Sequence, residues 1–196
     1  MSIDWRPRYH VLVTKADKTT LIKTLATDIG FDRVGVAEAR PIARVPYLTD
    51  WLASGRAGGM DYLRRNTTIR TDPTQLLDGA RSIIVVAMNY HQPEPPVTDE
   101  AIARGRVAMY AWGDDYHKIV KRKLHTLVDS LRERLPEPFD ARSCVDTVPI
   151  LERELAAAAG IGWIGKNTMV LHPDLGSYFF LGEILPLVNS NSLDLG

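Results

Sequence analysis

The stretch SIIVVAMN at residues 82–89 is the strongest structural signal in the chain. Its inner positions are all apolar and mostly β-branched, without alternation between apolar and polar residues. Such a run predicts a strand that is buried on both faces of a sheet. Shorter runs predict further strands at residues 34–37, 107–111, 143–145, 169–171 and 178–184.

Apolar residues at helical spacing lie on both sides of this strand in the sequence. The longest predicted helix covers residues 115–135, with one apolar stripe along its length. A helix over residues 20–29 has Asp17 as its candidate N-cap and Gly30 directly after its end. Shorter helices are predicted at residues 47–53, 60–65, 74–77 and 149–159.

The order of these elements indicates the fold class. Strands and helices are mixed without regular βαβ alternation, which favours an α+β fold over a doubly wound sheet. We expect a mixed sheet flanked by helices in a single domain over residues 17–186. Residues 1–16 are then an N-terminal extension, and residues 187–196 form an irregular tail.

The composition excludes several classes of protein. The chain has 196 residues, of which 45% are hydrophobic, so it can build a globular core. It carries 24 basic and 24 acidic residues, which disfavours a strongly basic nucleic-acid binder. Its single cysteine, Cys144, excludes a disulfide framework and is expected to be a small buried hydrophobe. No apolar run approaches a signal-peptide core or a membrane span, so we expect a cytoplasmic protein that does not contact membranes.

Two nucleotide-binding motifs are matched only in part. The run GIGWIG at residues 160–165 has the spacing of a dinucleotide fingerprint, but it follows a predicted helix instead of a strand. The same run with Lys166 and Asn167 lacks the hydroxyl that a P-loop places on magnesium. We expect a glycine-rich turn that can cradle a polar ligand. The five histidines have no metal-ligand spacing, so no metal site is predicted.

Two further features leave alternatives open. Asp146 lies three residues before Pro149, which suits the first turn of the predicted helix at 149–159. This carboxyl is either an N-cap or a general acid, and a general acid needs burial that favours its protonated form. Basic clusters at residues 64–70 and 118–123 are either solvated helix faces or contacts to phosphate groups.

Six stretches of the chain carry a resemblance to a known family. They read RTDP at 70–73, ARSIIVVAMNY at 80–90, YAWGDDYH at 110–117, VDTVPILER at 145–153, GIGWIGKNT at 160–168 and GSYFFLGE at 176–183. In this order they resemble the N-terminal domain of the epoxyqueuosine reductases, oxidoreductases of tRNA queuosine biosynthesis. The resemblance implies a cobalamin-binding module similar to nitroreductase-like cobalamin-processing proteins. It also implies the reductive removal of an epoxide oxygen at the wobble position of a tRNA anticodon.

Residue by residue, the resemblance assigns Asp146 as the acid that protonates the departing oxygen. A site covered by a flat corrin would favour the protonated form of such a carboxyl. The cofactor contacts that the resemblance implies, besides Asp146 itself, are Arg70, Ala108, Arg153, Lys166, Asn167, Val170, Ser177 and Leu181. The pair Asp115 and His117 matches the start of a histidine-ligated cobalamin motif, but Val120 replaces its glycine, and the family is thought to bind cobalamin without a histidine ligand.

The family also uses two [4Fe–4S] clusters in a following ferredoxin-like domain. One cysteine cannot ligate such a cluster, so we expect this chain to stop before that domain and to depend on a separate electron-donor domain or protein. The expected function is therefore the cobalamin-binding portion of an epoxyqueuosine reductase with tRNA as its partner. The alternative is a non-catalytic cobalamin-binding module or an inactive fragment.

Overall fold

The computed structural model describes residues 14–94, 105–135 and 137–188. The α-helices are α1 (Lys15–Ile29), α2 (Val45–Ala53), α3 (Thr67–Thr71), α4 (Tyr116–Arg134) and α5 (Glu152–Ala158). The 3₁₀ helices are η1 (Asp61–Leu63), η2 (Pro73–Leu76) and η3 (Met109–Ala111). The strands are β1 (Arg33–Glu38), β2 (Ser82–Asn89), β3 (Phe139–Cys144), β4 (Trp163–Ile164), β5 (Val170–Leu171) and β6 (Phe179–Val188).

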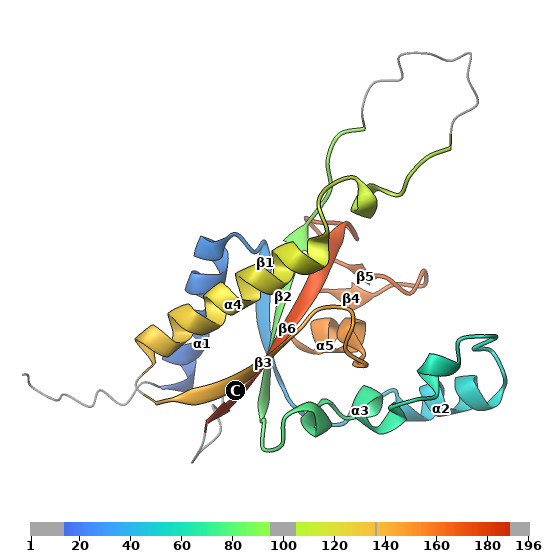
Figure 1. The fold of residues 1–196 in the computed structure, drawn as a ribbon, viewed down its shortest axis with the longest axis horizontal. Helices are drawn as coiled ribbons and strands as arrows, with labels where there is room; N and C mark the ends of the chain where they lie inside the picture. Colours follow the sequence, from blue (N-terminus) through green and yellow to red (C-terminus); the bar gives the residue numbers. More distant parts are fainter. Residues whose placement is uncertain (1–13, 95–104, 136, 189–196) are drawn as a thin grey trace, which may run out of the picture.

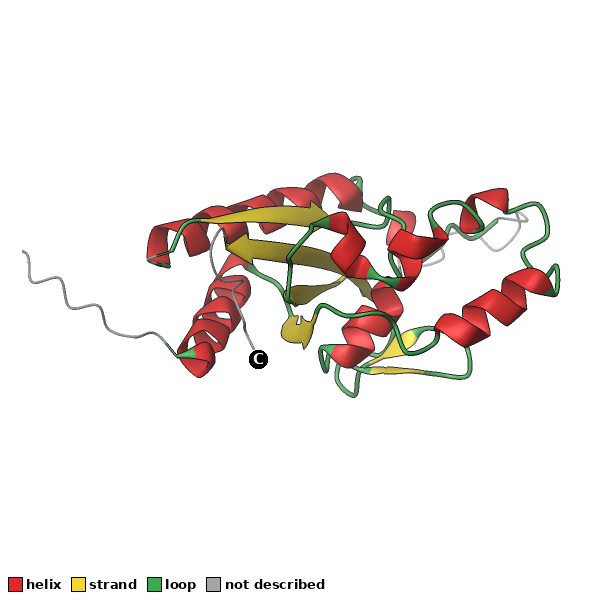
Figure 2. Ribbon diagram, turned by 90° about the horizontal axis from the view of Figure 1, so that it is seen from below, coloured by secondary structure: helices red, strands yellow, loops and turns green. Residues whose placement is uncertain are grey.

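The main sheet has the order β1-β2-β6-β3, with β2 and β6 in the centre. The α+β class is confirmed, but every neighbouring pair in this sheet is antiparallel, so the prediction of mixed strand directions was wrong. The reason is that no β-helix-β crossover places two parallel strands side by side. Helices cover both faces of the sheet (Figures 1 and 2).

The central strand β2 is buried on both faces, as its sequence predicts. Ile84 and Val86 contribute to one apolar cluster, and Ile83, Val85 and Ala87 contribute to the other. This alternation follows from the two-residue period of a strand, which sends successive side chains to opposite faces. Two cores therefore share one strand, one under α1 and α4 and one under α5.

Helices α1 and α4 cover the first face (Figure 1). The helix α1 begins earlier than predicted, because Thr14 is the N-cap and Asp17 completes a capping box from inside the first turn. Gly30 ends this helix in the left-handed conformation, as predicted. Gly182 of β6 lets α4 come close, since a Cβ there would lie 2.9 Å from Cγ1 of Val120.

The short helix α5 and the β4–β5 hairpin cover the second face. Leu155 and Ala156 are fully buried there against the sheet. A Cβ on Gly35 of β1 would overlap the carbonyl oxygen of Ala159, so a glycine is required for this close approach. The run GIGWIG leaves α5 at Gly160, which has a φ of 74°, and enters β4. The predicted order of helix, glycine-rich turn and strand is confirmed.

Three predicted elements were wrong in detail. Residues 107–111 form no strand but enter η3, because no neighbouring strand pairs with them. The helix predicted from Pro149 begins only at Glu152. The predicted helix at 60–65 is reduced to η1, and α3 forms at Thr67–Thr71 instead. Most of the predicted extension at 1–16 and tail at 187–196 lies outside the described residues. No helix in the described part of the chain is long and apolar enough to cross a membrane.

Candidate active site

Asp146 lies in the loop that joins β3 to α5. Its backbone has a φ of 50°, a left-handed conformation that is uncommon for a residue other than glycine. Val145 before it is buried, while the side chain of Asp146 is exposed, with 58% of its surface accessible to solvent. Glu152, where α5 begins, lies six positions after Asp146, so Asp146 is not the N-cap of that helix. The geometry instead presents a carboxylate from a constrained backbone.

Tyr116 and His117 of α4 converge on this carboxylate. The hydroxyl of Tyr116 donates a hydrogen bond of 2.5 Å to Oδ2 of Asp146, and Nε2 of His117 lies 3.4 Å from the same oxygen. The Tyr116 ring stacks on Phe180 with 4.0 Å between centroids, which fixes its position. Burial and the hydrogen bond to Asp146 both raise the pKa of the Tyr116 phenol, so it remains a donor at neutral pH.

The His117 ring is oriented by Asp115, the N-cap of α4. Oδ1 of Asp115 lies 2.9 Å from Nδ1 of His117 and also accepts a hydrogen bond from the backbone N–H of His117. The hydrogen bond to His117 lowers the pKa of Asp115 below its usual value, which keeps this carboxyl ionised. Because Asp115 engages Nδ1, the other ring nitrogen is directed at Asp146.

Two glutamates lie behind Asp146 on the α5 side of the sheet. The backbone N–H of Asp146 donates a hydrogen bond of 2.6 Å to Oε1 of Glu152. Burial and the Asp146 charge raise the pKa of Glu152 to about 7, against the opposing effects of the hydrogen bond from Asp146 and the charge of Arg153. Glu183 of β6 is 0% exposed, and neither of its carboxyl oxygens has a hydrogen-bond partner. Burial raises its pKa well above the ordinary value, which favours the protonated form of Glu183.

Cys144 lies beside Glu183 in the paired register of β3 and β6. It is buried, as the sequence predicts, and burial raises the pKa of its thiol to about 12. A thiol with this pKa stays protonated and is a poor nucleophile. Cys144 is therefore a packing residue.

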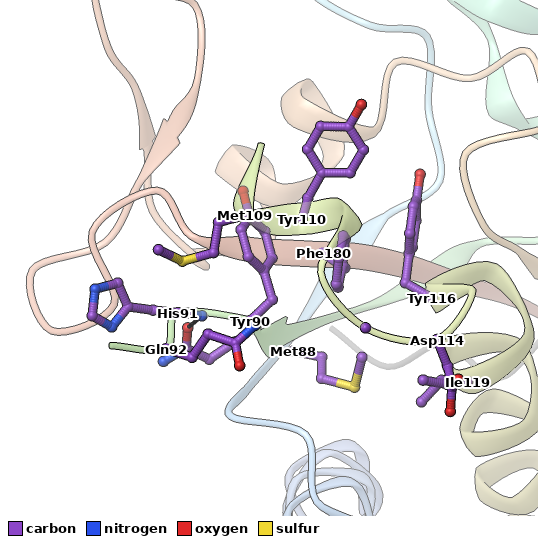
Figure 3. A pocket seen from close by; sticks show the side chains of 12 residues that line it. Met88, Tyr90, His91, Gln92, Met109, Tyr110, Asp114, Tyr116, Ile119 and Phe180 are labelled. Atoms are coloured by element: carbon purple, nitrogen blue, oxygen red, sulfur yellow. Dashed lines mark hydrogen bonds between the residues drawn. The ribbon is translucent and has the colours of Figure 1, made fainter. Parts of the chain in front are cut away.

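An aromatic pocket, shown in Figure 3, adjoins the Asp146 site through Tyr116. Its volume is about 260 Å³, and it lies between the ends of β2 and β6 and the start of α4. Tyr90, Tyr110, Tyr116 and Phe180 line it together with Met109. Tyr116 belongs to both the pocket and the Asp146 site, so the two share one wall. Such rings offer flat faces on which a planar heterocycle can stack.

Most of the predicted cofactor contacts gather around α5 and the β4–β5 hairpin. Nη1 of Arg153 donates a 2.6 Å hydrogen bond to the carbonyl oxygen of Thr168, which ties α5 to the glycine-rich turn. Lys166 and Asn167 are exposed on that turn. Val170 is buried in the core, so its side chain is not exposed to a ligand. Ser177 precedes β6, and Leu181 lies within it, and both are half-buried.

Arg70 and Ala108 lie apart from this group. Arg70 is on α3, and its Nε is buried without a hydrogen-bond partner. Ala108 is exposed at the start of η3. In Figure 1, α5 and the β4–β5 hairpin lie between these two segments. The predicted contacts thus follow an extended face of the molecule.

No group of three histidine, cysteine, aspartate or glutamate residues in the described part of the chain is arranged to hold a metal ion.

Three features of the site were not predicted from the sequence: the roles of Glu152 and Glu183, and the contact of Tyr116 with Asp146. A signal for Glu183 existed, because it is a charged residue inside an otherwise apolar strand. No sequence signal joins Tyr116 to Asp146.

Comparison with known proteins identifies the family. The family model described as "Epoxyqueuosine reductase QueG, DUF1730" matches residues 70–147. An epoxyqueuosine reductase of Cyclobacterium marinum is 37% identical over 180 residues, which are 90% of this chain and 57% of that protein. The chain belongs to the epoxyqueuosine reductase family. It spans about half the length of the curated relatives it matches.

Solved epoxyqueuosine reductases also share the fold. One is a crystal structure with an epoxyqueuosine-modified tRNA-Tyr stem loop, with a TM-score of 0.79 and 28% identity over 89% of this chain and 46% of that chain. Another is the epoxyqueuosine reductase of Bacillus subtilis, described with the loop of its catalytic aspartate swung out of the active site. It has a TM-score of 0.76 and 25% identity over 91% of this chain and 47% of that chain.

Proposed function

We propose that this chain is the cobalamin- and substrate-binding part of an epoxyqueuosine reductase that acts on the wobble nucleoside of tRNA in the cytoplasm. Asp146 is the acid that protonates the departing epoxide oxygen. One observation carries this assignment: an accessible carboxylate at the end of a strand is held by Tyr116 and approached by His117. A relative in the same family has a catalytic aspartate on a loop of its active site, which supports the same role here.

The reaction sets the demands on the site. Conversion of an epoxide to an alkene releases the oxygen as water and consumes two electrons and two protons. Asp146 supplies a proton at Oδ2, and Tyr116 keeps that oxygen in place. Covering this carboxyl with a flat cofactor excludes water and favours its protonated form. His117 lies close enough to the same oxygen to assist the return of a proton.

The predicted cofactor contacts suit cobalamin, whose corrin ring carries amide side chains and a phosphate-bearing tail. The Nε donor of Arg70 is buried without a partner and can bind one of these acceptors. Lys166 and Asn167 offer an exposed cation and an exposed amide on the glycine-rich turn. Arg153 holds that turn against α5. When bound, reduced cobalamin would supply the electrons, which an iron–sulfur domain or protein would deliver.

The aromatic pocket supports a nucleoside substrate. Tyr110 and Tyr90 present ring faces within reach of the Asp146 site through their shared neighbour Tyr116. A base that stacks there would place its substituent close to the acid. The neutral net charge of the chain leaves much of the tRNA backbone contact to other parts of the full protein.

Substitution Asp146→Asn tests the acid. The chain is loaded with cobalamin, reduced with a low-potential chemical reductant and given an epoxyqueuosine-modified stem loop. We expect cobalamin binding to persist and epoxide reduction to fall by at least about 100-fold, because a general acid contributes roughly 10²–10⁴-fold. The matched control is Asp140→Asn, an exposed carboxylate on the preceding strand, which should reduce at the wild-type rate. Equal rates for the Asp146→Asn variant and the wild type would remove the acid role.

The alternative function is a non-catalytic cobalamin-binding module. It predicts cobalamin binding that is the same in the wild type and the Asp146→Asn variant, with no epoxide reduction by either under the same reducing conditions. The two proposals therefore separate on wild-type turnover.

A further inference from the structure

The backbone of Asp146 is held by a side chain from the next helix. The loop between β3 and α5 forms close backbone turns at Thr147 and Ile150. The backbone N–H of Asp146 takes no part in these turns and instead donates a hydrogen bond of 2.6 Å to Oε1 of Glu152. This hydrogen bond therefore connects the part of the loop that carries the acid to the first turn of α5.

Glu152 is well placed to act as an anchor. Its helix is fixed to the sheet by the buried side chains of Leu155 and Ala156, and its C-terminal end packs against Gly35. The Asp146 backbone has a left-handed φ of 50°, a conformation that costs free energy. It persists only where neighbouring contacts offset that cost. A hydrogen bond to the amide of that same residue is such a contact.

We propose that Glu152 is the positioning residue of the acid loop: as a carboxylate it holds the Asp146 backbone in place, and on protonation it releases that hold. The inference rests on the proposed function only in the role it gives to Asp146. A carboxylate accepts a charge-assisted hydrogen bond from an N–H, which is roughly twice as strong as a bond to a neutral acceptor. The strength of the anchor thus depends on the charge of one side chain.

The surroundings of Glu152 allow this change of charge near neutral pH. Burial and the charge of Asp146 bring its pKa to about 7, while Arg153 and His117 favour the ionised form. Glu183 lies behind it on β6, and burial favours the neutral form of its carboxyl. The titratable and charged groups that act on this site from the surrounding elements are Asp146, Tyr116, His117, Cys144, Arg153 and Glu183.

The test follows the Asp146 amide by ¹H–¹⁵N NMR between pH 5.5 and 8.5. We expect its proton resonance to move downfield with rising pH, with a midpoint near 7, as Glu152 ionises. In the Glu152→Gln variant the amide oxygen can still accept the hydrogen bond but cannot titrate, so the resonance should stay in place across this range. In Glu152→Ala, hydrogen exchange at the Asp146 amide should accelerate by about tenfold, the effect of losing roughly one hydrogen bond.

Two variants separate Glu152 from its neighbours. Glu183→Gln keeps the shape of this side chain but cannot ionise, and it should leave the midpoint where it is. His117→Gln removes the imidazole that lies 3.4 Å from Oδ2 of Asp146, and the shift should persist. A titration that survives Glu152→Gln or disappears with His117→Gln overturns the proposal. This measurement needs neither cobalamin nor turnover, so its failure and failure of the proposed function are distinguishable.

Discussion

The hydroxyl of Tyr116 donates a hydrogen bond of 2.5 Å to Oδ2 of Asp146, so the first residue of α4 holds the carboxyl that follows β3. The two residues are 30 positions apart in the sequence. The Tyr116 ring stacks on Phe180 of β6, so this strand fixes the position from which Tyr116 contacts Asp146. The helix α4 and the loop after β3 thus meet at one oxygen atom, and Tyr116 of that helix packs on β6.

Substitution Tyr116→Phe tests this relationship. The ring should still stack on Phe180, so the fold should be retained, but the donor to Asp146 is removed. We expect the rate of epoxide reduction to fall about tenfold, because a hydrogen bond to a charged group contributes on the order of 1.5–3 kcal/mol and part of it is replaced by water. The rate is measured in a single turnover of cobalamin-loaded, chemically reduced protein. Tyr47→Phe, at an exposed position on α2, is the control, and an unchanged rate in Tyr116→Phe would refute this role.

Glu183 makes stability depend on pH. Its pKa is raised in the folded state, so the unfolded chain binds fewer protons than the folded chain above the ordinary carboxyl value of 4.5. Stability is therefore lost as pH rises from that value towards the raised pKa, by up to about 1.4 kcal/mol per pH unit for this group. Glutamine at this position cannot ionise. The free energy of unfolding of Glu183→Gln, relative to that of the wild type, should therefore rise between pH 5 and pH 8.

Urea unfolding at several pH values measures this difference. Glu133→Gln, an exposed position on α4, is the matched control and should show no pH-dependent advantage. A constant difference between Glu183→Gln and the wild type across this range would mean that Glu183 is not held neutral in the folded protein.

Gly35 tests the packing that supports the site. An alanine there would place a methyl group against the backbone carbonyl of Ala159, so β1 and the end of α5 must separate. We expect Gly35→Ala to lower the free energy of unfolding by about 2 kcal/mol or more, as overpacking against a rigid backbone does. Gly59→Ala, where no atom lies within 4 Å of the new methyl group, should be close to neutral in the same denaturation experiment. Equal stability of the two variants would contradict the observed packing.

The sequence predicts the parts of this fold that depend on local pattern. The run at 82–89 is the buried β2 strand, the long apolar stripe is α4, and Gly30 ends α1. These features follow from side-chain periodicity and from the conformational freedom of glycine, which a single sequence displays. The start of α5 was misplaced by three residues, because Pro149 suits a first turn but the loop that carries Asp146 occupies that position.

The site depends on contacts that local pattern does not carry. The resemblance to the family directs attention to Asp146, but the partners of this acid come from α4, α5 and β6. Glu152 is an ordinary first-turn acid in the sequence, and only the fold turns its carboxylate towards the Asp146 amide. Arg70 is one of many arginines until its burial without a partner for Nε distinguishes it. Tertiary geometry, not composition, assigns these roles.

The most direct test of the account is a titration of the purified chain with cob(II)alamin, followed by visible absorption and electron paramagnetic resonance. The account predicts a saturable change to a protein-bound, base-off signal. It also predicts an affinity about tenfold lower in Arg70→Ala, because an acceptor of the bound cobalamin then loses its buried donor. The affinity should be unchanged in Arg65→Ala, an exposed arginine five residues earlier. No spectral change at high cobalamin, or equal affinity in Arg70→Ala and Arg65→Ala, would contradict the proposed cobalamin-binding face.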